Sequence, residues 1–569
     1  MEGNQGVNQS VSMDSETSYP YADEHAKINR QSAEASSGNF SQVSAGDTSL
    51  IFQHGHAGRF PGVTDQEMEE SSSDEVDGEM GSFSELQADL KLDRARLQTL
   101  SRDDRQGHYK DDKKAYHVFY GTLEKSFQIL FPNGEIVVPS HALKQWARAM
   151  ETAYLGKNRQ FHSFGHVMGL CEGSTPQQKL GALFHDIAYF SVDGGPPEGS
   201  AHLLQGILQQ DAASEVAQTY IVLGANGDPV IDLVLTLFGV RKNQRMHPGN
   251  GLNEFASALI GAQYMRSHVP AYVIAQVTCC IEATIPFRKN VWADHLYERL
   301  TMLNTKHRLG MSPVCIEQSV MMAVDLGNKD VGDFFSQDFM FFITGTWALL
   351  PEMNPTIRRD SFCSITDWRC AIQKTYKFLS TLDPMIVFSQ WRGMPDNTKV
   401  GELMRRAMLN VELGEIYTGI KLATCLLIEA LQLYEVHNKK MSKDGSFFSE
   451  ERDSYYPSIS GYRGDSKTLV NVEAEMSVSY LMRALHHHDF MYTDLNCNGH
   501  IDEQLSYFSM LLCTGKTMEE ISGLIKAVVA TASVDTFDFM ETAAAKRVCD
   551  LFPPVLRDFI CRKFNESGV

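Results

Sequence analysis

Apolar residues recur at helical spacing over most of the chain between about residue 110 and residue 440. Loops rich in glycine, proline and asparagine interrupt these stripes. Few segments alternate between apolar and polar residues with the period of two that strands require. The pattern predicts an all-α protein, with a helical bundle over 110–345 and a helical extension over 346–440 that packs on the bundle.

The segments that flank this helical region differ from it in composition. Residues 1–83 lack periodicity, contain few aliphatic side chains and include an acidic serine tract, which predicts disorder. Ser84 and Gln87 form a capping-box pattern, and leucines at helical spacing then predict a helical lead-in over 84–109. Residues 441–470 are rich in Ser, Gly, Asp and Tyr, which predicts a linker.

A small set of polar residues inside apolar sequence carries the candidate chemistry. His162 and His166 are four residues apart, so on a helix their imidazoles would share one face. The pair His185–Asp186 follows in Gly-Ala-Leu-Phe-His-Asp-Ile-Ala-Tyr-Phe, with apolar residues on both sides. A carboxylate in such surroundings is costly unless it is paired. A divalent metal is the natural partner, because imidazole and carboxylate ligands suit Zn, Mn, Fe or Mg.

Together with Asp325 in Met-Ala-Val-Asp-Leu-Gly-Asn, this ordered set resembles the HD superfamily of metal-dependent phosphohydrolases, which includes the cyclic-nucleotide phosphodiesterases. The resemblance covers roughly residues 110–345 and implies an HD-type helical bundle. It implies that His162 protonates the leaving oxygen and that Asp186 bridges two metals if a second one binds. The implied ligands of the first metal are His166, His185, Asp186 and Asp325.

The chain departs from the phosphodiesterases after the His-Asp doublet. Those enzymes carry another histidine in His-Asp-x-x-His-Pro, whereas this chain reads His-Asp-Ile-Ala-Tyr-Phe. The segment Leu-Asn-Glu-Phe-Ala-Ser-Ala-Leu is similar to a region of those enzymes that contains an acid. Glu254 in this segment is either an acid that orients a bridging water or a plain helix-surface acid. Glu282, in an apolar run, either lines the pocket or forms a salt bridge, with Arg288 as the candidate partner.

These residue types suit the hydrolysis of a phosphoester. A bound divalent ion lowers the pKa of water toward neutrality and neutralises charge on phosphoryl oxygens. A histidine with a pKa of roughly 6.5 can supply the proton for the leaving group. We therefore predict a metal-dependent phosphohydrolase or phosphodiesterase for a small-molecule phosphoester or a nucleotide, with catalytic roles for His162, Glu254 and Glu282. The alternatives are a calcium-responsive binding protein that uses the domain as a scaffold, and a di-iron oxygenase of the same superfamily.

The C-terminal segment 471–569 contains a second motif. Tyr-Thr-Asp-Leu-Asn-Cys-Asn-Gly-His-Ile-Asp resembles an EF-hand calcium loop, although its position 12 is Leu505 and not the expected bidentate Glu. A helix pair is predicted to follow, at Met518–Ala530 and Glu541–Cys549. The alternative is a turn that keeps the EF-hand geometry without the ion. The Ca²⁺ ligands implied by the resemblance are Asp494, Asn496, Asn498, His500 and Asp502.

Charge and composition narrow the class of partner. The 569-residue chain has a net charge of −20, which argues against general nucleic-acid binding. The longest apolar run, near Phe339–Leu350, is too short to span a bilayer, and no N-terminal stretch reads as a signal peptide. The eleven cysteines contain no Cys-x-x-Cys pair and are interpreted as reduced core residues. We therefore expect a cytoplasmic protein with neither a nucleic-acid nor a membrane partner.

Overall fold

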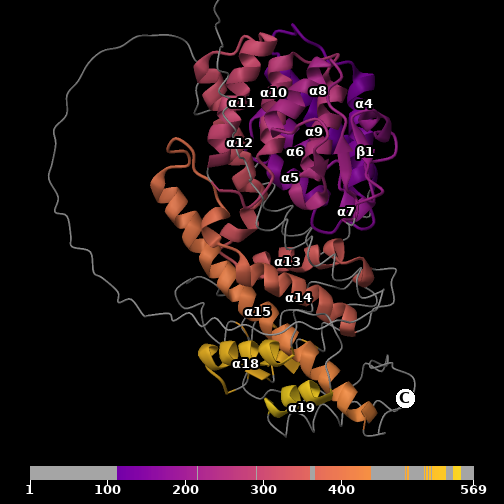
Figure 1. The fold of residues 1–569 in the computed structure, drawn as a ribbon. Coiled ribbons are helices and arrows are strands. Elements are labelled where there is room, and N and C mark those ends of the chain that lie inside the picture. The colour runs from indigo at the N-terminus through magenta and orange to yellow at the C-terminus, as the bar shows by residue number, and fades with distance from the viewer. Residues whose placement is uncertain are drawn as a thin grey trace, which may run out of the picture. The chain divides into compact units, whose positions relative to one another are not determined.

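The computed structural model describes most of the chain after residue 111. The described residues are 112–437, 515–532 and 542–552, with gaps at 215, 290 and 359–364, and single helical positions between 481 and 513. They belong to one compact unit. They are mostly helical (Figure 1), so the all-α prediction is confirmed. The predicted segments that lie outside the described residues are 1–83, 84–109 and 441–470.

The first part of the described chain is a helical bundle with one small antiparallel sheet in the order β1-β2-β3. Its helices are α3 (Asp112–Leu130), α4 (Ser140–Tyr154), α5 (Phe164–Cys171), α6 (Pro176–Phe184), α7 (Phe190–Asp193), α8 (Pro229–Phe238), α9 (Leu252–Met265), α10 (Ala271–Glu282), α11 (Val291–His307) and α12 (Pro313–Asp330). The strands are β1 (Leu208–Gln210), β2 (Tyr220–Val222) and β3 (Arg245–Met246). The 3₁₀ turns are η1 (Ala201–Leu204) and η2 (Pro248–Asn250).

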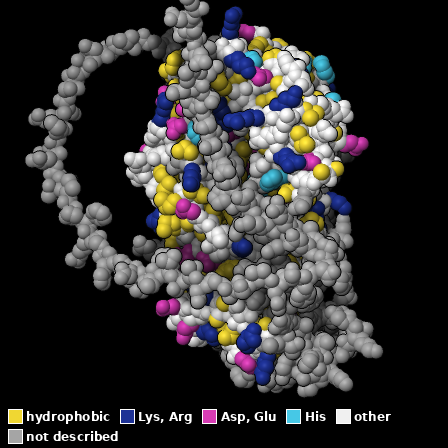
Figure 2. All heavy atoms as spheres, viewed as in Figure 1, with side chains coloured by type: hydrophobic (Ala, Val, Ile, Leu, Met, Phe, Trp, Pro, Cys, Tyr) yellow, Lys and Arg dark blue, Asp and Glu magenta, His cyan; other side chains and the backbone are white. Residues whose placement is uncertain are grey.

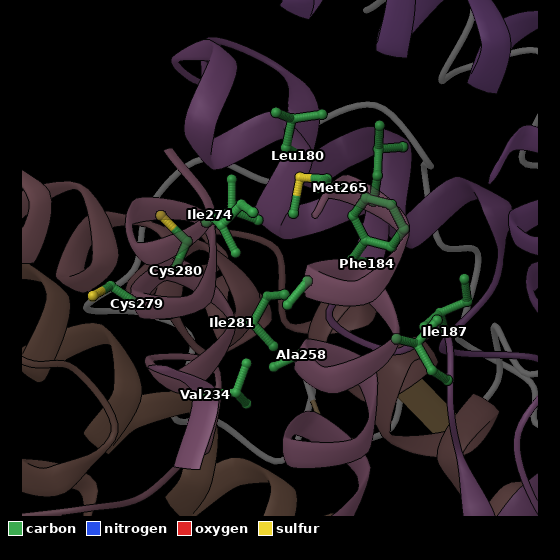
Figure 3. Packing of buried hydrophobic residues seen from close by; sticks show 14 of the residues in the cluster. Leu180, Phe184, Ile187, Val234, Ala258, Met265, Ile274, Cys279, Cys280 and Ile281 are labelled. Carbon is green, nitrogen blue, oxygen red and sulfur yellow. The ribbon is translucent and has the colours of Figure 1, made fainter. Parts of the chain in front are cut away.

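Helix α10 is the centre of the first core. It packs against α6, α8, α9 and α12, and its residues from Val273 to Glu282 are all buried. A helix that is apolar nearly all round is expected in such a central position. Figure 3 shows Ile274 and Ile281 of α10 among side chains from the neighbouring helices, including Phe184 of α6 and Ala258 of α9.

Two glycines let the helices that carry the site approach α10 closely. A Cβ on Gly181 of α6 would lie 2.6 Å from the Cβ of Cys280. A Cβ on Gly327 of α12 would lie 2.5 Å from the carbonyl oxygen of Ala283. Real side chains do not tolerate such distances, so both positions require glycine for this packing. The positions of α6 and α12 therefore follow from small residues in the sequence.

The second part of the described chain has a core of its own. It begins at Phe339, within the segment that the sequence assigned to the bundle. The long helix α15 packs against α14, α18 and α19. The helices of this second part are α13 (Phe339–Met353), α14 (Ile365–Thr381), α15 (Asn397–His437), α18 (Met518–Thr531) and α19 (Thr542–Asp550). The 3₁₀ turns near them are η3 (Gly332–Phe335), η4 (Pro355–Ile357) and η5 (Pro384–Ile386).

The predicted C-terminal helix pair is confirmed as two helices. The helices α18 and α19 match Met518–Ala530 and Glu541–Cys549 to within one residue at each end. Helix α18 begins with a capping box, in which the Thr517 hydroxyl accepts from the N–H of Glu520 while the Glu520 carboxylate accepts from the N–H of Thr517.

Two observations bear on possible partners. Among the described residues, no helix has the length and apolar character needed to cross a bilayer. Figure 2 shows basic and acidic side chains interspersed over the visible face, without a continuous basic stripe among the residues described there.

Candidate metal centre

Three segments that are far apart in the sequence meet in one group of polar side chains. His166 lies on α5, His185 and Asp186 follow α6, and Asp330 is the last residue of α12. We call these four residues the His–Asp cluster. Helix α12 packs against both α5 and α6. One donor atom each from His166, His185 and Asp186 lies within 4.8 Å of the other two, so the structure brings these three predicted ligands together.

The chain around the doublet is fixed on both sides. Helix α6 begins with a capping box at Thr175, and His185 caps its C-terminal end. After the doublet, the N–H of Ala188 donates to the hydroxyl of Ser257, and the N–H of Phe190 donates to the side-chain oxygen of Asn253. Both acceptors lie on α9. Backbone hydrogen bonds to a packed helix hold the doublet in one place.

The distances within the cluster are short. His185 Nε2 lies 2.9 Å from Asp186 Oδ2 and 3.4 Å from Asp330 Oδ1. His166 Nε2 lies 3.1 Å from the same oxygen of Asp330. Donor atoms about 2.0–2.2 Å from one ion lie roughly 3–4 Å from one another. These three distances are close to that range, and the three residues whose donor atoms all lie within 4.8 Å of one another are His166, His185 and Asp186, with Asp330 beside both histidines.

The structure corrects the fourth predicted ligand. Asp325 does not join the cluster: its carboxylate lies 3.0 Å from Lys329 Nζ, accepts from Gln178 at 2.7 Å, and its side chain is 56% exposed. Asp330 occupies the position in the cluster that the sequence analysis predicted for Asp325. Residues five apart on a helix point about 140° apart, so the two aspartates cannot face the same neighbours. The buried stripe of α12 runs through Ala323 and Leu326, and its spacing leads to Asp330.

The protonation of His185 is set by its second ring nitrogen. Nδ1 lies 2.8 Å from the carbonyl oxygen of Ala182, which can only accept, so Nδ1 carries a proton. Nε2 is buried and has no hydrogen-bond partner, although two carboxylate oxygens lie near it. A backbone carbonyl on the far nitrogen is the arrangement that orients metal-binding histidines. The orphaned Nε2 is thus an atom that fits a metal.

Electrostatics in the cluster also favour a cation. Burial by itself lowers the pKa of His185, but the carboxylates of Asp186 and Asp330 raise it well above its usual range. Burial by itself raises the pKa of Asp186, but the imidazoles of His185 and His162 hold it well below its usual range. The carboxylates therefore stay charged and draw positive charge into the cluster, which either a proton or a divalent ion can supply.

His162 lies next to the cluster with a different partner. Its Nδ1 lies 2.6 Å from Oε2 of Glu352, and its Nε2 lies 3.9 Å from Oδ2 of Asp186. The other oxygen of Glu352 accepts from the N–H groups of Gln160, Phe161 and His162, at 2.6, 2.7 and 3.1 Å. Burial by itself lowers the pKa of His162, but the carboxylates of Glu352 and Asp186 raise it.

The sequence prediction missed Glu352 and misjudged the backbone of His162. Helix α5 begins at Phe164, so His162 precedes it and does not share a helical face with His166. Their rings still meet edge to face, with centroids 5.6 Å apart. Glu352 lies on α13 and is 1% exposed. Its only signal in the sequence was a lone acid in the apolar run Leu-Leu-Pro-Glu-Met.

The structure separates the two predicted acids. Oε2 of Glu254 is buried without a hydrogen-bond partner, and burial together with the Asp186 carboxylate raises the pKa of Glu254 to about 7. The buried oxygen and the raised pKa favour the interpretation of Glu254 as a residue of the site over its interpretation as a helix-surface acid. Glu282 is instead bound by Arg288, at 2.7 and 3.2 Å, and by Arg299 at 3.3 Å. The salt-bridge interpretation of Glu282 is correct, and a catalytic role for it is not supported.

The calcium loop lies outside the described residues, including its predicted ligands Asp494, Asn496, Asn498, His500 and Asp502. Leu505, at position 12 of that loop, is described: it is helical and fully buried in the second core. Its apolar side chain therefore has a packing role at the position where an EF-hand has its bidentate acid.

Comparisons with known proteins find no relative of this chain. No protein-family model, no curated protein and no solved structure matches it. The resemblances to the HD superfamily and to EF-hands therefore rest on the sequence motifs, and the case for a metal centre rests on the geometry of the His–Asp cluster.

Proposed function

We propose that this chain is a metal-dependent phosphohydrolase or phosphodiesterase that acts on a small-molecule phosphoester or nucleotide. The observation that carries the proposal is the buried Nε2 of His185, which lacks a hydrogen-bond partner inside a group of two imidazoles and two carboxylates. Such a donor set suits Zn, Mn, Fe or Mg, which are the ions expected from the sequence.

In this proposal His166, His185, Asp186 and Asp330 hold the ion. A bound divalent ion supplies Lewis acidity and lowers the pKa of a water molecule toward neutrality. Asp330 replaces Asp325 in this set, because only Asp330 contacts the two histidines. Glu254 has a buried, unpaired oxygen and a raised pKa, which suits an acid that accepts or returns a proton near neutral pH.

His162 is the proton donor for the leaving oxygen in this proposal, and Glu352 is its positioning residue. The Glu352 carboxylate accepts from Nδ1 of His162 and so favours the charged imidazolium. It also holds the backbone of residues 160–162 through three N–H groups. The remaining ring nitrogen, Nε2, is the one that lies toward Asp186. A proton at this nitrogen is therefore held beside the cluster.

A cytoplasmic location remains part of the proposal. The eight described cysteines are all free thiols, and most of them are buried. Free thiols in this number are typical of a reducing compartment.

The test is a metal and phosphoester screen on the full-length protein. The protein is stripped with a chelator, reloaded separately with Mn, Mg, Co or Zn, and assayed on nucleotides, cyclic nucleotides and a nitrophenyl phosphate diester. We expect hydrolysis that depends on the metal and disappears in Asp186→Ala. The matched control is Asp211→Ala. It also removes an aspartate, but Asp211 pairs with the exposed Arg245 and not with a residue of the His–Asp cluster.

Two results of this screen would overturn the proposal. Two irons per chain with no hydrolysis would favour the di-iron oxygenase. Absence of any bound transition metal, with turnover by none of the four loaded forms, would favour a scaffold without catalytic function.

A further inference from the structure

Tyr189, three residues after Asp186, places a phenol against His162, which lies next to the His–Asp cluster. Its ring packs edge to face against the imidazole of His162, with centroids 4.7 Å apart and an interplanar angle of 82°. The side chain is 7% exposed. Its hydroxyl donates to the thioether sulfur of Met353 at 3.9 Å, which is a weak acceptor. The phenol is therefore a strong donor that is paired only weakly in this contact.

The surroundings keep this hydroxyl protonated. Burial raises the pKa of Tyr189 well above its usual range, and the carboxylates of Glu352, Asp186 and Glu254 raise it further. A protonated phenol is a poor ligand for a hard cation, but it can donate to an anionic oxygen.

The backbone holds Tyr189 in a fixed position. Its carbonyl accepts from the N–H groups of Val192 and Asp193, and the N–H of the next residue donates to Asn253 of α9. Arg159 donates to the carbonyl of Asp186 and to Asp193, so the same short segment is fixed on its other side. A donor that is held rigidly loses little entropy when a ligand arrives, which is the requirement for stabilising an oxyanion.

A phosphoryl group at this site needs such a donor. The ion proposed for the His–Asp cluster would neutralise charge on the phosphoryl oxygens it contacts, but the carboxylates of Glu254 and Glu352 repel the others. The two nearby guanidinium groups are engaged elsewhere: Arg159 pairs with Asp193, and Arg358 donates to the carbonyls of Pro351, Ser191 and Glu352.

We propose that the Tyr189 hydroxyl donates a hydrogen bond to a non-bridging oxygen of the phosphoryl group bound at the His–Asp cluster. This inference rests on the proposed function for the nature of the ligand. It makes Tyr189 a catalytic residue, because its hydroxyl touches the group that reacts. It also gives a role to the tyrosine that this chain carries where the phosphodiesterases carry the last histidine of His-Asp-x-x-His-Pro.

Tyr189→Phe tests the inference, because it removes the hydroxyl and keeps the ring against His162. The probe is inorganic phosphate, titrated by calorimetry into the metal-loaded full-length protein. We expect about a tenfold to hundredfold weaker phosphate binding, because a hydrogen bond to a charged group is lost. We also expect about a hundredfold lower kcat on phosphoesters, with unchanged metal content.

Tyr220→Phe is the matched control. Tyr220 packs its ring on Phe190, the residue after Tyr189, with centroids 5.0 Å apart, and it is only partly buried. This variant loses a hydroxyl near the same segment, and we expect it to bind phosphate as the wild type does.

The outcomes separate the inference from the proposed function. Weaker phosphate binding in Tyr189→Phe alone supports the inference, even if the wild type hydrolyses no phosphoester and the proposed function fails. Equal phosphate affinity in Tyr189→Phe, Tyr220→Phe and the wild type overturns it. A metal-loaded wild type that binds no phosphate overturns it as well.

Discussion

His185 and His162 both turn Nε2 toward Oδ2 of Asp186, at 2.9 and 3.9 Å, but their second ring nitrogens have different partners. Nδ1 of His185 donates to a carbonyl, which adds no net charge, and its Nε2 faces the carboxylates of Asp186 and Asp330, which raise its pKa. Nδ1 of His162 lies against the Glu352 carboxylate, whose full negative charge favours the imidazolium. Nε2 of His185 can exchange its proton for a metal ion between those carboxylates, whereas the imidazolium of His162 suits a proton donor. The partners of Nδ1 thus separate the two roles.

His162→Ala tests this division at the scale of one residue. We expect the variant to keep its metal, since Nε2 of His162 lies 3.9 Å from the nearest cluster oxygen that it contacts, Asp186 Oδ2. Turnover should fall by about 10²–10⁴-fold on poor leaving groups and much less on a nitrophenolate, which needs no proton. The exposed His141 provides the control His141→Ala. Loss of metal from His162→Ala would instead make His162 a ligand.

At the scale of the elements, the site depends on how closely α12 approaches α10. Gly327 lies one turn before Asp330, and a Cβ there would meet the carbonyl oxygen of Ala283 at 2.5 Å. The last turn of α12 can therefore place Asp330 against α5 and α6 only because residue 327 has no side chain. A larger residue has to push this turn away from the His–Asp cluster.

Gly327→Ala should destabilise the protein by about 1–3 kcal/mol through overpacking, even though alanine favours helices. It should also weaken metal binding, because Asp330 moves with the helix. Gly121→Ala in α3 is the control: nothing lies within 4 Å of its added Cβ, so it should be neutral or stabilising by up to about 1 kcal/mol. Chemical unfolding and a metal titration measure both effects. Equal behaviour of the two variants would contradict the packing argument.

A salt bridge between α8 and α11 gives a prediction for pH. Asp232 lies 2.6 Å from Lys306 and 2.7 Å from His307. Burial by itself raises the pKa of Asp232, but these two partners lower it below its ordinary value. A carboxyl with a lowered pKa in the folded state adds stability above its unfolded pKa, near 3.9, and that stability is lost as the pH falls through the folded value.

Asp232→Asn should therefore reduce the free energy of unfolding by about 1 kcal/mol or less at pH 7, because the group is partly exposed. The difference from the wild type should shrink as the pH falls below about 4. Urea unfolding between pH 7 and pH 3 measures it, with the exposed Glu298 of α11 changed to Gln as the control. If the stability difference between Asp232→Asn and the wild type grew on acidification, the pKa of Asp232 would be shifted in the opposite direction.

The sequence was sufficient to predict where the helices lie along the chain, but not which face of each helix points toward the site. Apolar periodicity indicated the all-α class and the helix pair α18 and α19. The position of Asp330 could have been found by following the buried stripe through Ala323 and Leu326, since a 3.6-residue period carries it to residue 330. Motif similarity instead favoured Asp325, which lies off that stripe. Glu352 could not be found in this way, because its contact depends on how α13 packs against the loop before α5.

At the scale of the whole molecule, the second core contributes to the site of the first. Glu352 belongs to α13 of the second core, yet its carboxylate holds the backbone of residues 160–162. The second core begins before the predicted boundary at residue 345, because Phe339 already belongs to it. The helical extension is therefore part of the proposed enzyme and not an appendage.

Leu505→Glu tests the place of the C-terminal region in this core. Because Leu505 is fully buried, a carboxylate there loses apolar burial and leaves a charge without a partner. We expect the free energy of unfolding to fall by about 3 kcal/mol or more. Leu551 is 39% exposed, so Leu551→Glu should change the free energy of unfolding only slightly. A stable Leu505→Glu protein that also gains calcium affinity would mean that residue 505 belongs to an ion-binding loop.

The most direct test of the central claim is the metal content of two aspartate variants on α12. Asp330→Ala removes a carboxylate that contacts both histidines, whereas Asp325→Ala removes one that contacts Lys329 and Gln178. Elemental analysis of the purified full-length proteins should find metal in the wild type and in Asp325→Ala, and little or none in Asp330→Ala. Metal retained by Asp330→Ala and lost from Asp325→Ala would contradict the assigned centre.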